Sequence, residues 1–187
     1  LYQHEWEERL VAQKMPQYVE DSIIQAYYSS HKSHYILKET ILRGVLLVVP
    51  NGAPNMDELK RRITKPNEEE NIEWLEKYAY QYASGYELFL EEWKNANQIL
   101  LYMPSDEASL LKQLKQKSQI VVQDTVNSYV LQVTDIHARG EQMPIEYARG
   151  EIEKTILRQR QVEFIQSERD ALYERAIQLG KMKRYEK

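Results

Sequence analysis

Four histidines, His4, His31, His34 and His137, are the side chains of this chain with the most evident capacity for acid–base chemistry or metal binding. None is accompanied by acidic or thiol ligands in a known metal-binding motif, and the chain contains no cysteine. His31 and His34 are three residues apart and could share a helix face, but solvent-facing or structural histidines are the favoured interpretation. We therefore expect no metal site and no cofactor.

Other familiar catalytic arrangements are absent from the sequence. Its 6 glycines are scattered singly, so no glycine-rich phosphate loop is present, and there is no Gly-x-Ser-x-Gly motif. The acidic runs "EEEN" and "LEEW" are typical of solvated helix ends, and nothing in them separates a general acid from a general base. The residue types alone indicate no catalytic site.

Composition narrows the classes of partner. The 25 basic and 29 acidic residues give a net charge of −4, which argues against a nucleic-acid partner. No apolar run approaches the roughly 20 residues of a membrane span. The 14 tyrosines against 2 phenylalanines suit amphipathic contact surfaces, or equally a modest core with polar tips. The lack of cysteine weakly favours an oxidising envelope compartment.

Hydrophobic spacing predicts the elements that must position any site. Helices are expected over 1–14, 19–31, 56–63, 67–84, 105–117 and 145–179, with Ser105 as an N-cap and Gly85 ending the fourth helix. Strands are expected over 41–49, 118–123 and 127–136, the last two joined as a hairpin by "DTVN". Residues 87–94 remain ambiguous, and 98–103 fit a strand or a turn.

This order predicts an α+β fold, in which a small antiparallel sheet carries packed helices and is flanked by an N-terminal helix pair and a long C-terminal helix. The last helix is longer than so small a sheet domain can cover. It must pack on something else, and the N-terminal helices are the candidate within the chain. Because the chain opens at Leu1 inside an expected helix, we also expect that an upstream segment was removed.

Gly44 is the unusual residue of the first strand, "ILRGVLLVV". Five branched apolar residues follow it and predict a strand buried on both faces. A glycine weakens a strand, so its presence needs a reason. Close packing of a helix on the strand would be one.

Three stretches resemble a known family. "DSIIQAYYSSHKSHYILKETILRGVLLVV" is similar to the entry into parvulin-type peptidyl-prolyl isomerase (rotamase) domains of SurA- and PrsA-like chaperones. "SYVLQVTDIHARGEQMPIEYARGEIEKTILRQRQVEFIQ" resembles their last strand and following helix, and "LYERAIQLGKMKRYEK" resembles their end, where a short strand follows. The resemblance divides the chain into the remnant of an N-terminal chaperone region (1–35), a degenerate parvulin-like domain (36–137) and a C-terminal long helix that packs on the N-terminal helices (138–187).

The family's chemistry does not carry over with the resemblance. Active parvulins place one histidine in the first strand and one in the last, and these positions fall on Gly44 and Tyr129. "YELFLEEW" replaces the segment that lines the proline pocket, and Met103-Pro104 only loosely matches the motif after it. No catalytic residue is therefore assigned, while Trp93, Met103 and Tyr129 are the expected substrate-binding residues.

Three functions are considered, the first two implied by the resemblance and the third by the length of the last helix. The favoured one is a periplasmic or envelope chaperone that binds unfolded polypeptides, chiefly outer-membrane ones, through a parvulin-like scaffold. The second is a weakly active isomerase, because this reaction is a bond rotation that needs no nucleophile. The third is a structural module that forms homo-oligomers through the long helix.

Overall fold

The computed structural model describes residues 2–180, with side chains from residue 5 onward. The chain divides into two compact units, one formed by Leu1–Tyr35 with Pro144–Lys187 and the other by Ile36–Met143. The first is called the helical unit and the second the sheet unit. The short strand expected after the last helix falls on 181–187 and lies outside the described residues.

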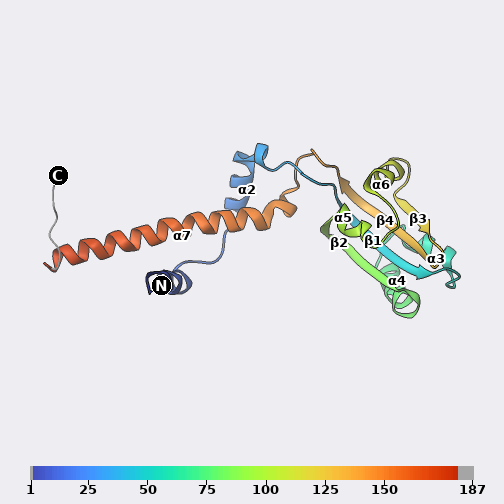
Figure 1. Ribbon diagram of the computed structural model, residues 1–187, viewed down its shortest axis with the longest axis horizontal. Coiled ribbons are helices and arrows are strands. Elements are labelled where there is room, and N and C mark those ends of the chain that lie inside the picture. The colour runs from blue at the N-terminus through green and yellow to red at the C-terminus, as the bar shows by residue number, and fades with distance from the viewer. Residues whose placement is uncertain (1, 181–187) are drawn as a thin grey trace. The chain divides into compact units, whose positions relative to one another are not determined.

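The helical unit is built on α7 (Ile145–Gln178), a helix of 34 residues and therefore about 51 Å long. Helices α1 (Tyr2–Lys14) and α2 (Asp21–Ser30) both contact it, and the short 3-10 turn η1 (Lys32–His34) follows α2 (Figure 1). Its buried side chains Ala148, Ile152 and Ile156 lie in the first half of the helix. The long helix thus has partners from the same chain.

Arginines of α7 add polar contacts with the N-terminal helices. Arg149 pairs with Asp21 at 2.6 Å, which raises the pKa of the guanidinium above its usual value. Arg160 donates to the backbone oxygen of Tyr18 at 3.0 Å. Further along, Arg169 pairs with Glu7 of α1. Asp21 and Arg169 are exposed, whereas Glu7 is half-buried, so these contacts add less stability than the buried apolar side chains of the unit.

The sheet unit contains, among the described residues, four strands in one antiparallel sheet of order β2-β1-β4-β3. The strands are β1 (Ile41–Pro50), β2 (Gly85–Asn95), β3 (Gln119–Gln123) and β4 (Asn127–His137). Helices α3 (Met56–Arg62) and α4 (Glu69–Tyr82) connect β1 to β2, and α5 (Ala96–Leu100) and α6 (Glu107–Leu114) connect β2 to β3. The predicted α+β class, with a small antiparallel sheet and packed helices, is confirmed.

Both faces of the sheet are covered, which explains the unbroken apolar run in β1. Leu42, Leu46 and Val48 join a core with residues of α5 and α6, including Ile99 and Leu110. Val45, Leu47 and Val49 join a second core with Leu59 of α3 and Leu75 of α4. Figure 1 shows these two helix pairs on opposite sides of the sheet.

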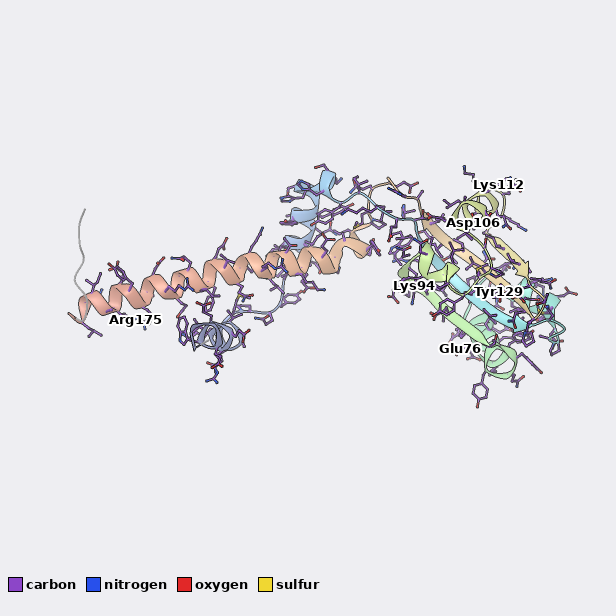
Figure 2. All side chains as sticks on the ribbon, viewed as in Figure 1. Glu76, Lys94, Asp106, Lys112, Tyr129 and Arg175 are labelled. Atoms are coloured by element: carbon purple, nitrogen blue, oxygen red, sulfur yellow. The ribbon has the colours of Figure 1, made fainter. Side chains whose placement is uncertain are left out.

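In the middle of the chain one expectation was wrong, and an open alternative was decided against a strand. The cap of α6 is Asp106 and not Ser105: its side chain accepts from the amide of Ser109 at 2.9 Å, and these bonds lower the pKa of the carboxyl (Figure 2). Residues 98–103 form no strand. They belong to α5 and the turn after it, and the helix starts at a capping box in which Asn95 and Gln98 satisfy each other's backbone amides.

Candidate peptide-binding site

Gly44 lies where the backbone of β4 leaves no room for a side chain on β1. The register slips by one residue between Arg43 and Gly44 on the β4 side, and by three residues between Leu42 and Gly44 on the β2 side. A Cβ built at position 44 would stand 2.1 Å from the backbone oxygen of Gln132. The glycine is therefore required by the neighbouring strand, and not by a helix as the sequence suggested.

Tyr129 lies at the other end of the same sheet, on β4 (Figure 2). Its hydroxyl donates to Oδ2 of Asp124 at 2.7 Å, and this bond, with burial, raises the pKa of the phenol. Asp124 also accepts from the amides of Val126 at 2.7 Å and Asn127 at 2.6 Å. Its pKa is lowered, first by the Asn127 amide and then by Tyr129 and Val126. The hydroxyl of this strand residue is thus bonded to the β3–β4 turn.

The two positions that the resemblance assigns to histidines are not paired across the strands. Gly44 lies opposite Val133, whereas Tyr129 lies opposite Val48. Val48 is four residues further along β1, which corresponds to about 13 Å. The structure therefore places Gly44 and Tyr129 on one sheet without bringing them to one point.

The other expected substrate-binding residues are buried in two different clusters. Met103 is 4% exposed and shares a core cluster with Tyr129. Trp93 is 8% exposed and packs in a separate cluster with Leu37 and Ile41. The Arg43 guanidinium lies 4.3 Å from the centroid of the Trp93 ring. The buried Nε1 of Trp93 has no hydrogen-bond partner among the described residues. Their role in binding stays a prediction.

The histidines form no metal site among the side chains that the structure describes. His31 bonds through Nδ1 to the backbone oxygen of Tyr27 at 2.8 Å, and its ring lies 5.9 Å from that of His34. His137 stands 3.1 Å from Glu141 and 5.0 Å from the ring of Trp93. The side chain of His4 lies outside the described ones.

An apolar cavity of about 330 Å³ opens beside the core that holds Met103 and Tyr129. Its walls come from α6 and from the end of β4 with the loop after it: Leu111, Leu114, Lys115, Ile136, Ala138 and Glu141. Leu114 and Ile136 rest on the core, so the inner wall is fixed by packing. A cavity of this size takes one apolar side chain of a bound polypeptide comfortably.

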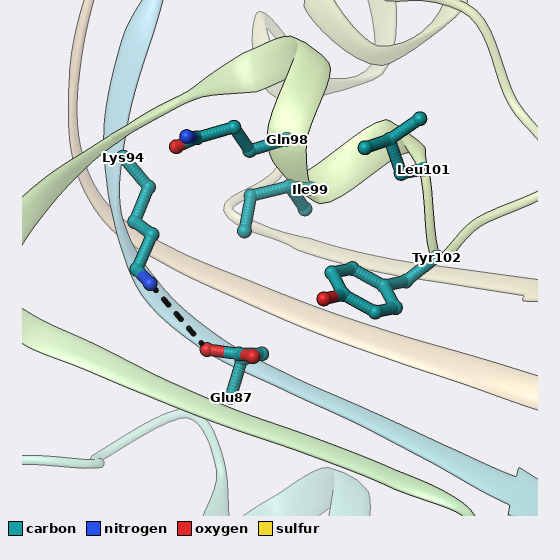
Figure 3. Close-up of a pocket in the computed structure, with 6 residues that line it drawn as sticks. All are labelled: Glu87, Lys94, Gln98, Ile99, Leu101 and Tyr102. Carbon is teal, nitrogen blue, oxygen red and sulfur yellow. Dashed lines mark ion pairs between the residues drawn. The ribbon is translucent and has the colours of Figure 1, made fainter.

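A second cavity, of about 230 Å³, lies between β2 and α5 (Figure 3). Ile99 is buried there, whereas Leu101 is 84% and Tyr102 52% exposed. The Lys94 amine pairs with Glu87 at 3.6 Å across the opening. An exposed leucine–tyrosine pair beside a charged rim is a further surface on which an apolar segment can lie.

The sequence pattern missed the residues of both cavities. Leu111 and Leu114 were placed on a helix, but the strand against which that helix lies was unknown. The one usable signal is in the apolar alternation of β4. The apolar residues on one of its faces follow one another at a spacing of two up to Val133, but the next one, Ile136, comes three residues later. That slip indicates a bulge, and the apolar cavity lies directly after it.

Comparison with known proteins identifies no family. Neither a protein-family model nor a curated protein matches the sequence. Among solved structures, the chain is similar to one from work describing PEB4, a virulence factor, and the periplasmic protein Cj1289 of Campylobacter jejuni as structurally related SurA-like chaperones. The identity is 14% and the TM-score 0.34, over 100% of this chain and 70% of that chain.

None of the described helices is long and apolar enough to cross a membrane.

Proposed function

We propose that this protein binds unfolded or extended polypeptides as a chaperone-like module, in the periplasm or another envelope compartment. The observation that carries the proposal is the apolar cavity between α6 and the end of β4. It is open, its floor is fixed by the core, and no described side chain fills it. Folded partners seldom offer single protruding apolar side chains, whereas unfolded chains offer many.

Two other features support binding to unfolded chains. Exposed tyrosines occur on both units, as Tyr18, Tyr80 and Tyr102, and provide apolar area with a polar tip. The net charge of −4 and the absence of cysteine suit a client-binding protein of an oxidising compartment better than a nucleic-acid binder. Outer-membrane polypeptides are the proposed clients, because their segments alternate apolar and polar residues.

The test is suppression of aggregation. An outer-membrane β-barrel protein unfolded in urea is diluted into buffer with the full chain, and light scattering is followed. We expect scattering to fall as the chain is added, and no fall at several-fold excess would contradict the proposal. Leu111→Gln, which makes the cavity wall polar, should suppress less well. Lys112→Gln, on the exposed side of the same helix (Figure 2), should act like the unaltered protein.

The isomerase alternative has no comparable support. Trp93 and Met103 are buried in different clusters, and a histidine at position 44 would meet the backbone oxygen of Gln132. It stays a prediction that a protease-coupled proline-peptide assay decides. The oligomerisation alternative is decided by the mass in light scattering.

A further inference from the structure

The outer side of β4 is only partly covered by β3. Strand β3 pairs with Ser128 to Gln132, and the amide of Val133 makes the last contact, with the backbone oxygen of Ser118 at 2.9 Å. Beyond that point β4 continues to His137 and pairs on its other side with β1. In the described part of the chain, no strand pairs with the outer side of 134–137. This four-residue stretch is called the open edge.

One backbone amide of the open edge is already bonded to a side chain. The amide of Ile136 donates to Oδ1 of the adjacent Asp135 at 2.9 Å. An aspartate that bonds the next amide is a local substitute for a strand partner. A charged side chain at a strand edge also hinders indiscriminate pairing with other chains. The open edge is therefore protected yet able to exchange this contact for a backbone one.

The cavities on the two sides of the open edge differ in chemistry. The apolar cavity lies on the α6 side and includes Ile136 and Ala138. A cavity of about 460 Å³ lies on the side of the α3–α4 connection, and its walls are mostly polar: Thr64, Lys65, Pro66, Asn67, Glu68, Ser118, Gln132, Val133 and Thr134. A strand added here would send successive side chains alternately into these two environments.

Gln132 gives independent support for a ligand in the polar cavity. Its side chain is 4% exposed, and its Nε2 donates to the backbone oxygen of Val133 at 3.2 Å. Its Oε1 is buried without a partner among the described residues. Such an orphaned acceptor costs free energy, and a donor brought by a ligand would remove that cost.

The charges around both cavities are balanced. Lys115 and Glu141 line the apolar cavity, and Lys65 pairs with Glu68 at 3.3 Å beside the polar one. A segment of strong single-sign charge would meet one like and one opposite charge at each cavity, and would gain no net attraction to offset the loss of its hydration. An uncharged, alternating segment loses no such hydration, so the charges favour that class of partner.

We propose that a segment of a client polypeptide, extended and alternating between apolar and polar residues, adds to the open edge as a strand antiparallel to β4. Its apolar side chains enter the cavity of Leu111, Leu114 and Ile136, and its polar ones face Gln132 and Thr134. Its backbone bonds the outward-facing groups of 134–137 and displaces Asp135 from the Ile136 amide. This proposal rests on the proposed function and adds the conformation and pattern of the client.

The test uses the full chain and a fluorescein-labelled decapeptide in which valine alternates with threonine, read by fluorescence anisotropy. Two further peptides carry N-methyl groups on three valine amides or on three threonine amides. Only one of these sets faces β4 in an added strand, because successive residues point their N–H groups to opposite sides. We expect that set to bind at least about tenfold more weakly, through the loss of about two backbone hydrogen bonds, and the other to bind normally.

Matched variants place the site on the protein. Ala138→Glu puts a carboxylate at the apolar cavity and should weaken binding at least about tenfold, by the cost of desolvating the charge. Val126→Glu adds the same charge at the exposed hairpin turn and should leave binding unchanged. If Ala138→Glu fails to fold by circular dichroism, the N-methyl comparison still decides, because it leaves the protein unaltered.

The outcomes separate this proposal from the proposed function. Equal affinity of the two N-methylated peptides overturns strand addition, while polypeptide binding stands. Suppression of client aggregation with no binding of the alternating peptide also overturns the proposal alone. If the chain neither suppresses client aggregation nor binds the alternating peptide, the proposed function and strand addition both fail. A dimer that dissociates on adding peptide would show that a second copy occupies the edge, and would likewise contradict a client strand as its occupant.

Discussion

The helical unit and the sheet unit are stabilised in different ways. The sheet unit buries residues of every strand and of α3, α4, α5 and α6 in two cores, one on each face of the sheet. Among the described residues the helical unit buries fewer apolar side chains, on α7 (Ala148, Ile152 and Ile156) and on the N-terminal part (Val11, Met15, Val19 and Ile24). Because less apolar area is buried, the helical unit should open at a lower free energy than the sheet unit.

The largest expected effect is on the sheet unit, through Gly44→Ala. The added Cβ meets the Gln132 backbone oxygen at 2.1 Å, and a paired strand cannot move aside. We expect a loss of at least about 3 kcal/mol in the free energy of unfolding. Urea denaturation followed by circular dichroism measures it.

A matched glycine in the other unit serves as the control for that substitution. Gly150 is in α7, and a Cβ there would have no atom within 4 Å outside the helix's own backbone. Gly150→Ala should therefore stabilise by about 0.5–1 kcal/mol. A similar loss at both glycines would show that the close approach of β4 is not the cause.

The next effect concerns the buried apolar residues of α7 in the helical unit. Ile152 is fully buried on α7, so Ile152→Ala should cost about 2–4 kcal/mol. If the two units unfold separately, only the earlier transition should shift, and Leu47→Ala in the sheet should shift the later one. Native-state hydrogen exchange resolves the two. A single transition that moves equally for both variants would remove the contrast between the units.

The smallest effect is a pH dependence at the β3–β4 turn. Asp124 has a lowered pKa in the folded protein, so its contribution is present above the ordinary aspartate pKa of about 3.9 and is lost as the pH falls through the lowered value. Asp124→Asn should reduce the difference in unfolding midpoint between about pH 7 and about pH 3. An unchanged difference would mean that the turn does not depend on the charge of this carboxyl.

Local patterns predicted most elements of the fold, including β1, the β3–β4 hairpin and α7. Strand β2 was missed because Glu91 and Glu92 interrupt the apolar alternation. The alternation breaks at the irregularity in the β1–β2 pairing. On one side of this irregularity Phe89 pairs with Gly44, and on the other side Lys94 pairs with Leu42. Strand β2 is at the edge of the sheet and pairs with β1 alone, and this pairing is irregular. Such a strand does not require apolar and polar residues to alternate regularly, so its sequence does not show that alternation.

The candidate site was less predictable than the fold. Leu111 and Ala138 belong to segments far apart in the chain, and only the packing of α6 against the end of β4 makes them neighbours. Met103 and Tyr129, which the sequence led us to expect as substrate-binding residues, belong to the core beside the cavity and not to its lining. Periodicity reports which face is buried and does not report where packing is incomplete.

The close approach at Gly44 also bears on how the sheet forms. Strands β1 and β4 are about 80 residues apart in sequence. Their pairing therefore closes a long loop, and we expect it to form slowly during folding. In the register that forms, the backbone oxygen of Gln132 leaves no room for a Cβ at position 44. Gly44 therefore permits this alignment of the two strands, which any other residue at that position would disfavour.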